Sequence, residues 1–260
     1  MKRVVVISDL HCGHKTGLTH PDFEPGGFVN DSPAHRLSLM RREYWAFYAR
    51  TIEALQPIDV LVVNGDAIDG RGEKSGGTEL LEADRHKQCE MAQAAIEVCR
   101  AGAIRMTYGT PYHTGDKEDY EGIIAKAVGA EIKDIVSLDV SGLVFDIRHH
   151  IGGSQSPIGR HTAIDREGLW NILWSERGER PKANVIIRSH THYFKYGGDA
   201  DSLGIITPAL QGLGGKYGGR RMSGTVDFGL ISFDVESGDE WSWNHHILRA
   251  KRARVVAEKV

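Results

Sequence analysis

Val4-Val5-Val6-Ile7-Ser8-Asp9-Leu10-His11 is the stretch that decides the fold of this 260-residue chain. The run of four β-branched residues indicates a buried parallel strand, and the Ser-Asp that follows marks its carboxyl end. Asp9 and His11 stand one residue apart just past that end. Both side chains can therefore project to one side and share a metal ion. The competing interpretation is a helix cap followed by a surface histidine.

The same pattern of strand and helix continues along the first half of the chain. Apolar residues at helical spacing, β-branched runs and closing signals such as Pro57 predict helices at 34–55, 80–100 and 120–128 and strands at 60–63 and 104–108. Strands that alternate with helices favour a parallel sheet.

After residue 128 the rhythm changes to strands with fewer helices. The predicted elements of this half are strands at 143–148, 185–188, 204–207 and 228–233, a helix at 164–174 and a last edge strand at 241–248. A second, mixed sheet is expected there. The Gly-rich stretch 212–219 is interpreted as a long loop, because it lacks the helix and the Lys-Ser/Thr pair of a phosphate-binding loop.

The composition, 40% hydrophobic and 26% charged, is that of a globular protein, and we expect a single domain over residues 1–260. No apolar run is long enough to cross a bilayer, and the N-terminus lacks a signal-peptide core. The three cysteines have no metal-type spacing, so a cytoplasmic protein without disulfides is expected. The basic tail at about residues 249–260 is a candidate contact for nucleic-acid phosphates, although such a run is commonly a solvated face.

Metal-binding side chains also follow three other predicted strands. Asp66 comes after the strand at 60–63, behind Gly65, where a turn residue is the competing interpretation. His149-His150 ends the strand at 143–148, and His190-Thr191-His192 follows the strand at 185–188. Four strand ends that each deliver Asp or His to one edge of the sheets predict a shared metal site.

These residues and their order resemble the calcineurin-like metallophosphoesterase superfamily, whose motifs run D-x-H, G-D-x-x-D, G-N-H-D/E, a lone His, and G-H-x-H. The resemblance spans about residues 4–233. The matching segments are Ser8-Asp9-Leu10-His11, Gly65-Asp66-Ala67-Ile68-Asp69, His150 and His190-Thr191-His192. The resemblance implies an α/β fold of two packed mixed β-sheets flanked by helices, an αββα sandwich.

By that resemblance, Asp9, His11 and His192 hold one ion, His150 and His190 hold a second, and Asp66 bridges them. Two divalent ions are implied, with manganese as the first choice and iron or zinc as alternatives. We expect His150 rather than His149 to be the ligand, because successive side chains on a strand face opposite ways and the family's ligand directly precedes the site loop. A register shifted by one residue would exchange the two.

The third motif departs from the family pattern, because Gly109-Thr110-Pro111-Tyr112-His113-Thr114-Gly115 contains no Asn. His113 is therefore predicted either to replace the Asn as a ligand of the second ion or to protonate the leaving oxygen as a catalytic acid. Thr110 offers a hydroxyl at the same place. The second ion is expected to be held more weakly.

The resemblance implies two-metal hydrolysis of a phosphoester bond by a hydroxide that bridges the ions, with nucleotides or nucleic acid as substrates. A diesterase or nuclease is favoured slightly over a monoesterase, because Asp69-Gly70-Arg71-Gly72 differs from the Asp-Arg-Gly of protein phosphatases. Candidate contacts for the phosphate are Arg148, Arg160 and His161. The competing interpretation is that each is a surface residue that only aids solubility. The alternatives are a metal-binding scaffold without catalysis and a protein phosphatase.

Overall fold

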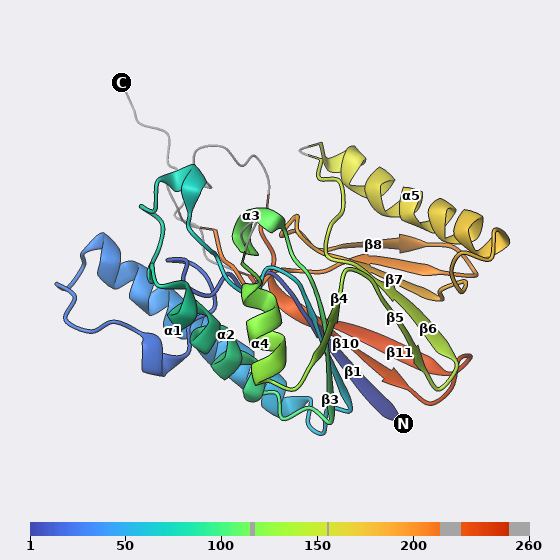
Figure 1. The fold of residues 1–260 in the computed structure, drawn as a ribbon, viewed down its shortest axis with the longest axis horizontal. Coiled ribbons are helices and arrows are strands. Elements are labelled where there is room, and N and C mark those ends of the chain that lie inside the picture. The colour runs from blue at the N-terminus through green and yellow to red at the C-terminus, as the bar shows by residue number, and fades with distance from the viewer. Residues whose placement is uncertain (115–117, 155, 214–224, 250–260) are drawn as a thin grey trace.

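The strands of the protein form two sheets in the computed structural model, which describes residues 1–114, 118–154, 156–213 and 225–249 (Figure 1). The first sheet, in the order β11-β10-β1-β2-β3-β4, contains β1 (Lys2–Ile7), β2 (Val60–Asn64), β3 (Ala103–Thr107), β4 (Glu131–Lys133), β10 (Phe228–Val235) and β11 (Trp241–Leu248). The second, in the order β5-β6-β7-β9-β8, contains β5 (Val136–Val140), β6 (Leu143–Ile147), β7 (Val185–Arg188), β8 (Lys195–Gly198) and β9 (Leu203–Ile206).

Both sheets are mixed. In the first, β1 to β4 are parallel, while β10 pairs antiparallel with β1 and β11 with β10. In the second, β6, β7 and β9 are parallel and β5 and β8 run the other way. Strand β10 was expected in the second sheet, and this expectation is wrong, whereas β11 is an edge strand as predicted. Strand β10 pairs with β1 on the side opposite β2, and it is buried along almost its whole length.

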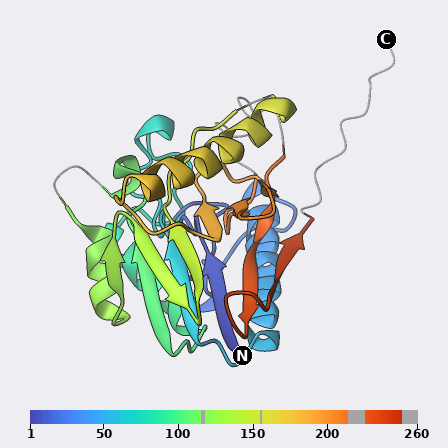
Figure 2. The same ribbon diagram turned by 90° about the vertical axis from the view of Figure 1, so that its right-hand side faces the viewer.

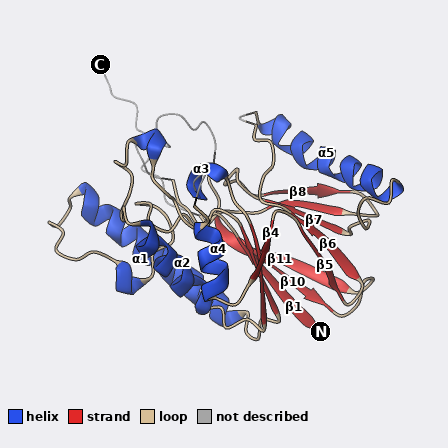
Figure 3. Ribbon diagram, viewed as in Figure 1, coloured by secondary structure: helices blue, strands red, loops and turns tan. Residues whose placement is uncertain are grey.

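Helices cover the outer faces of the two sheets (Figures 1 and 3). They are α1 (Pro33–Ala54), α2 (Arg85–Glu97), the short α3 (Pro111–Thr114), α4 (Tyr120–Ala127) and α5 (Pro157–Glu176), with 3-10 turns at Pro21–Phe23 and Glu73–Ser75. Helix α2 begins later than predicted because the Asp84 side chain caps it at His86 N. Helix α5 begins earlier than predicted, at Pro157, a residue that suits a first helical turn.

The core consists of three apolar layers. Val5 and Ile7 of β1 pack toward the helices of the first sheet, whereas Val4 and Val6 pack against the second sheet. This alternation is what a strand buried on both faces requires. A third cluster, which includes Ile164, lies between α5 and the second sheet. The turned view shows the layered arrangement (Figure 2), and the predicted fold class, two packed mixed β-sheets flanked by helices, is confirmed.

The parallel strands matter for function because their carboxyl ends lie at one edge of each sheet. Most of the glycine-rich stretch, from residue 214 to 219, and the basic tail from residue 250 onward lie outside the described residues. Among the described helices, none combines the length and apolar character that a membrane span requires.

Candidate metal centre

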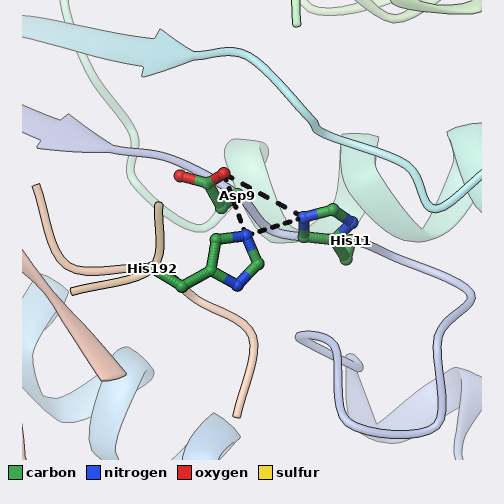
Figure 4. A group of neighbouring side chains, drawn as sticks. All are labelled: Asp9, His11 and His192. Atoms are coloured by element: carbon green, nitrogen blue, oxygen red, sulfur yellow. Dashed lines mark hydrogen bonds and ion pairs between the residues drawn. The ribbon is translucent and has the colours of Figure 1, made fainter. Parts of the chain in front are cut away.

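The loops that follow β1, β2, β6 and β7 bring together two groups of Asp and His side chains that could hold a metal ion. The first group is Asp9, His11 and His192, and the second is Asp66, His149 and His190. Within each group the ligand atoms lie within 4.8 Å of one another. Figure 4 shows the first group, in which the two imidazoles and the carboxylate converge.

Asp66 connects the two groups. Its Oδ2 lies 3.0 Å from His149 Nε2 and 3.9 Å from both His11 Nε2 and His190 Nδ1. Imidazole nitrogens of both groups therefore lie within 3.9 Å of one carboxylate oxygen, so Asp66 lies between the two groups.

Asp9 shows that the site suits a cation. Its Oδ1 lies 3.2 Å from His192 Nε2 and 4.0 Å from His11 Nε2. Asp9 is fully buried, yet among the described residues this oxygen has no hydrogen-bond partner. A buried carboxylate oxygen is costly unless something compensates its charge. Carboxylate oxygens together with imidazole nitrogens are a donor set that Mn, Fe or Zn accepts, so the residues present fit a divalent ion.

The backbone of the site is strained. Asp9, His11, Asp66, His190 and His192 all have positive φ, between 42° and 74°. Only three other described residues that are not glycine do so. Such conformations cost free energy in non-glycine residues and gather at functional sites, where the surrounding structure enforces them.

Two histidines are held by their far nitrogen. His11 Nδ1 lies 3.1 Å from Asp69 Oδ1, and His149 Nδ1 lies 2.7 Å from the carbonyl oxygen of Asn64. Each bond fixes the ring so that Nε2 faces the crevice, as outer partners of metal ligands commonly do. Sequence reasoning did not assign Asp69 or Asn64 a role. Asp69 stands in the G-D-x-x-D motif and was detectable there, whereas nothing in the sequence marks the Asn64 carbonyl.

Burial and the neighbouring charges give His11 and His149 very different pKa values. Burial lowers the pKa of His11 to about 4. Burial also lowers the pKa of His149, but the charge and hydrogen bond of Asp66 outweigh it and raise this pKa to about 10. Burial would raise the pKa of the Asp66 carboxyl, yet the neighbouring imidazoles, His149 first, hold it well below its usual range. His11 is therefore neutral at pH 7, whereas His149 carries a proton.

His149, not His150, faces the crevice, which corrects the predicted register. Side-chain alternation continues past the end of β6, and Arg148 turns toward α5, where Nη2 donates to Glu167 Oε2 at 2.7 Å. The next side chain, His149, therefore points to the opposite side, toward Asp66. His150 is exposed and stacks on His190 with 4.8 Å between ring centroids.

The altered third motif places Thr110 within the second group. Thr110 Oγ1 lies 3.2 Å from Asp66 Oδ2 and 3.1 Å from His190 Nδ1. His113 lies to one side, with Nδ1 2.8 Å from the carbonyl oxygen of Asp69 and Nε2 3.9 Å from Asp66 Oδ2. His113 also forms a third possible ligand group with His11 and Asp69.

The three candidate phosphate contacts differ in their surroundings. Besides its bond to Glu167, the Arg148 guanidinium lies over Trp174. Arg160 lies 4.2 Å from the ring centroid of Tyr193 and donates to Thr225 Oγ1 at 3.3 Å. No carboxylate of the described residues pairs with Arg160, and His161 is exposed on α5.

No family model and no curated protein sequence matches the chain. Among solved structures, an archaeal phosphodiesterase is 15% identical, with 94% of this chain and 99% of that one covered and a TM-score of 0.45. Vps29 from Entamoeba histolytica, complexed with zinc, is 11% identical, with 94% and 98% covered and a TM-score of 0.43. A predicted phosphoesterase from Streptococcus pneumoniae is 10% identical, with 94% and 97% covered and a TM-score of 0.39. Any assignment of function therefore depends on the chemistry of the residues at the strand ends.

Proposed function

We propose that this chain is a two-metal phosphoesterase that hydrolyses phosphodiesters or phosphomonoesters, with nucleotides or nucleic acid as the substrate class. The position of Asp66 supports this most strongly, because its Oδ2 lies within 3.9 Å of imidazole nitrogens from both ligand groups. In this proposal Asp9, His11 and His192 hold one ion, His149 and His190 hold the other, and Asp66 bridges the pair. Mn²⁺ is the first choice of ion, with iron or zinc as alternatives.

When bound, two such ions supply Lewis-acid activation of water and of the phosphoryl oxygens. The protein's own contribution is to hold its ligands in one orientation. Asp69 fixes the ring of His11 and the Asn64 carbonyl fixes that of His149 through bonds of 3.1 and 2.7 Å. The strained loops add to this rigidity, because the surrounding structure holds their backbone in unfavourable conformations.

His113 is our candidate for the acid that protonates the leaving oxygen. The bond from its Nδ1 to the Asp69 carbonyl leaves Nε2 free on the side of Asp66 Oδ2, 3.9 Å away, in a ring that is only partly buried. Thr110 Oγ1 lies 3.2 Å from Asp66 Oδ2, closer than His113 Nε2 at 3.9 Å, and it also contacts His190, which favours the acid role of His113 over the ligand role.

Replacement of His113 by alanine distinguishes these roles. We expect His113→Ala to keep both ions and to lose about 10²–10⁴-fold in rate, the usual contribution of a general acid. The loss should shrink for aryl esters such as p-nitrophenyl phosphates, whose leaving groups need little protonation. Metal analysis and rates on aryl and alkyl esters measure both points, and an empty second site in this variant would instead make His113 a ligand.

Arg160 is our candidate substrate contact. It lies beside Tyr193, which directly follows the ligand His192, and its charge has no carboxylate partner among the described residues. Arg148 is less suited to bind phosphate, because its guanidinium already contacts Glu167 at 2.7 Å. Its position suits a tether between β6 and α5.

Turnover tests the proposed function against a non-catalytic scaffold. The scaffold has one observation in its favour, namely that Thr110 stands among the ligands of the second group where the family has Asn. Metal-stripped protein reloaded with Mn²⁺ should hydrolyse bis-p-nitrophenyl phosphate, p-nitrophenyl phosphate or single-stranded DNA. Failure on all of them with two ions bound would favour the scaffold, and activity confined to phosphopeptides would indicate a protein phosphatase.

A further inference from the structure

Glu121 is a buried carboxyl directly behind the candidate metal centre. It lies in the first turn of α4 with no exposed surface. Acidic side chains are almost never fully buried unless paired, yet no basic side chain of the described part of the chain forms an ion pair with Glu121. Burial and then the charge of Asp66 raise the pKa of its carboxyl to about 7. Two backbone hydrogen bonds compensate this burial in part.

The hydrogen bonds of Glu121 reach both loops of the second ligand group. Oε1 accepts the backbone N–H of Ala67 at 3.1 Å, and Oε2 accepts that of Gly109 at 2.7 Å. Ala67 directly follows the ligand Asp66, and Gly109 directly precedes Thr110. One side chain therefore joins the loop after β2 to the loop after β3, each at the residue next to the site.

The two loops approach more closely than ordinary side chains would allow. A Cβ added at Gly109 would lie 2.2 Å from both N and Oδ1 of Asp66. At this separation Thr110 N donates to Asp66 Oδ1 at 2.6 Å, which fixes the direction of the carboxylate. The β2–β3 pairing ends at Asn64 and Thr107. Beyond it, side-chain bonds from Glu121 and Asp66 join the loops.

We propose that Glu121 is a positioning residue of the metal centre, which fixes the separation of Asp66 and Thr110 and thereby the affinity of the Asp66–His149–His190 group for its divalent ion. The inference rests on the proposed function only in that this group binds an ion. A residue that merely stabilised the fold would affect both ligand groups alike. Glu121 should instead act more strongly on the second group, because Thr110 contacts His190 of that group and Asp66 Oδ2 lies nearer to His149 Nε2, at 3.0 Å, than to His11 Nε2, at 3.9 Å.

Mn²⁺ titration of the metal-stripped full chain tests the proposal. The substitution Glu121→Gln keeps the volume but turns an amide N–H toward one of the two backbone donors. We expect the binding step of the second group to weaken about 10–100-fold, as outer partners of ligands typically cause. The step of the first group should weaken clearly less, because Asp66 is the only one of its proposed ligands that lies beside a bond of Glu121. His149→Ala and His192→Ala identify the two steps, because each removes a ligand of one group.

The matched control is Glu90→Gln on α2, where the carboxyl is exposed and removal of its charge should leave both steps unchanged. Should Glu121→Gln fold poorly, Glu121→Asp keeps the charge, shortens the reach by one methylene and should give the same selective loss. Equal weakening of both steps, or no change in either, would overturn the inference while leaving the proposed function intact. A wild-type chain that binds no Mn²⁺ would overturn both.

Discussion

The two ligand groups of this site share an edge of the fold and differ in what their atoms contact. In the first group Asp9 Oδ1 has, among the described residues, no donated hydrogen bond and lies 3.2 Å from His192 Nε2, and the pKa of His11 is lowered to about 4 by burial. In the second group Thr110 N and Oγ1 donate to the two oxygens of Asp66, and His149 holds a proton with its pKa raised to about 10. If each group binds a cation as we propose, the second must give up hydrogen bonds from Thr110 and a proton from His149, whereas Asp9 Oδ1 of the first has no such hydrogen bond to give up among the described residues.

This difference explains why two groups with similar ligands need not have the same affinity for an ion. Both His11 and His149 have their Nδ1 bonded to an oxygen, so ring orientation does not separate them. The bonds at the carboxylates do. Asp66 accepts two hydrogen bonds from Thr110 and lies 3.0 Å from His149 Nε2, whereas Asp9 Oδ1 lies 3.2 Å from His192 Nε2 and, among the described residues, accepts no hydrogen bond. An ion pair that is stable without a metal competes with the metal. We therefore expect the second group to be the weaker site.

Asp66→Asn should have the largest effect, because it removes the carboxylate that both groups share. We expect both binding steps to weaken by more than the roughly 10–100-fold that outer partners cost, with activity lost and the fold retained. Metal analysis and circular dichroism of the variant measure this. Two tightly held ions with normal turnover would show that Asp66 is only a turn residue.

A comparison of His149→Ala with His150→Ala tests the second group by itself. His149→Ala should weaken ion binding to the second group about tenfold or more and leave binding to the first group nearly unchanged. Of these two histidines, it is His149 whose Nε2 lies 3.0 Å from Asp66 Oδ2. His150→Ala should change either step by less than about threefold, since the exposed ring only stacks on His190. A larger loss in His150→Ala would restore the register predicted from the sequence.

The smallest effect is a difference in proton release between the two groups. At pH 7.5, Mn²⁺ binding to the second group should release about one proton from His149, and binding to the first should release close to none. Calorimetric titrations in two buffers of different ionisation enthalpy, on wild type and His149→Ala, measure this difference. Equal release from both groups would remove the distinction between them.

The raised pKa of His149 also determines how the stability of the metal-stripped protein changes with pH. Because the pKa of His149 lies above its ordinary 6.5, its pairing with Asp66 stabilises the fold fully below pH 6.5 and is lost as pH rises through about 10. The Asp9 carboxyl behaves oppositely, because burial raises its pKa but the neighbouring histidines, His192 first, lower it to about 2. Its contribution is present above pH 3.8 and is lost as pH falls through about 2.

The sequence by itself determined most of the order of strands and helices and most of the residues that converge at the site, but strands β4, β5 and β8 were not predicted. Hydrophobic periodicity depends on neighbours along the chain, so β1, β2, α1 and β11 were placed within a residue or two. The position of an Asp or His just after a strand can also be recognised from neighbouring residues in the sequence. Five of the six predicted ligands converge in the two groups. The joining of β10 to β1 was not predicted, because strand pairing joins residues more than 200 positions apart.

Only the tertiary structure decided which of two adjacent histidines faces Asp66, and which carboxyl lies behind the site. The choice of His149 over His150 depends on α5, whose Glu167 holds Arg148 on the far side. Glu121 belongs to no sequence motif that we recognised. Its proposed role depends on the packing of α4 against the ends of β2 and β3. Charge and hydrogen bonding between segments distant in sequence are set by packing, and no local pattern records them.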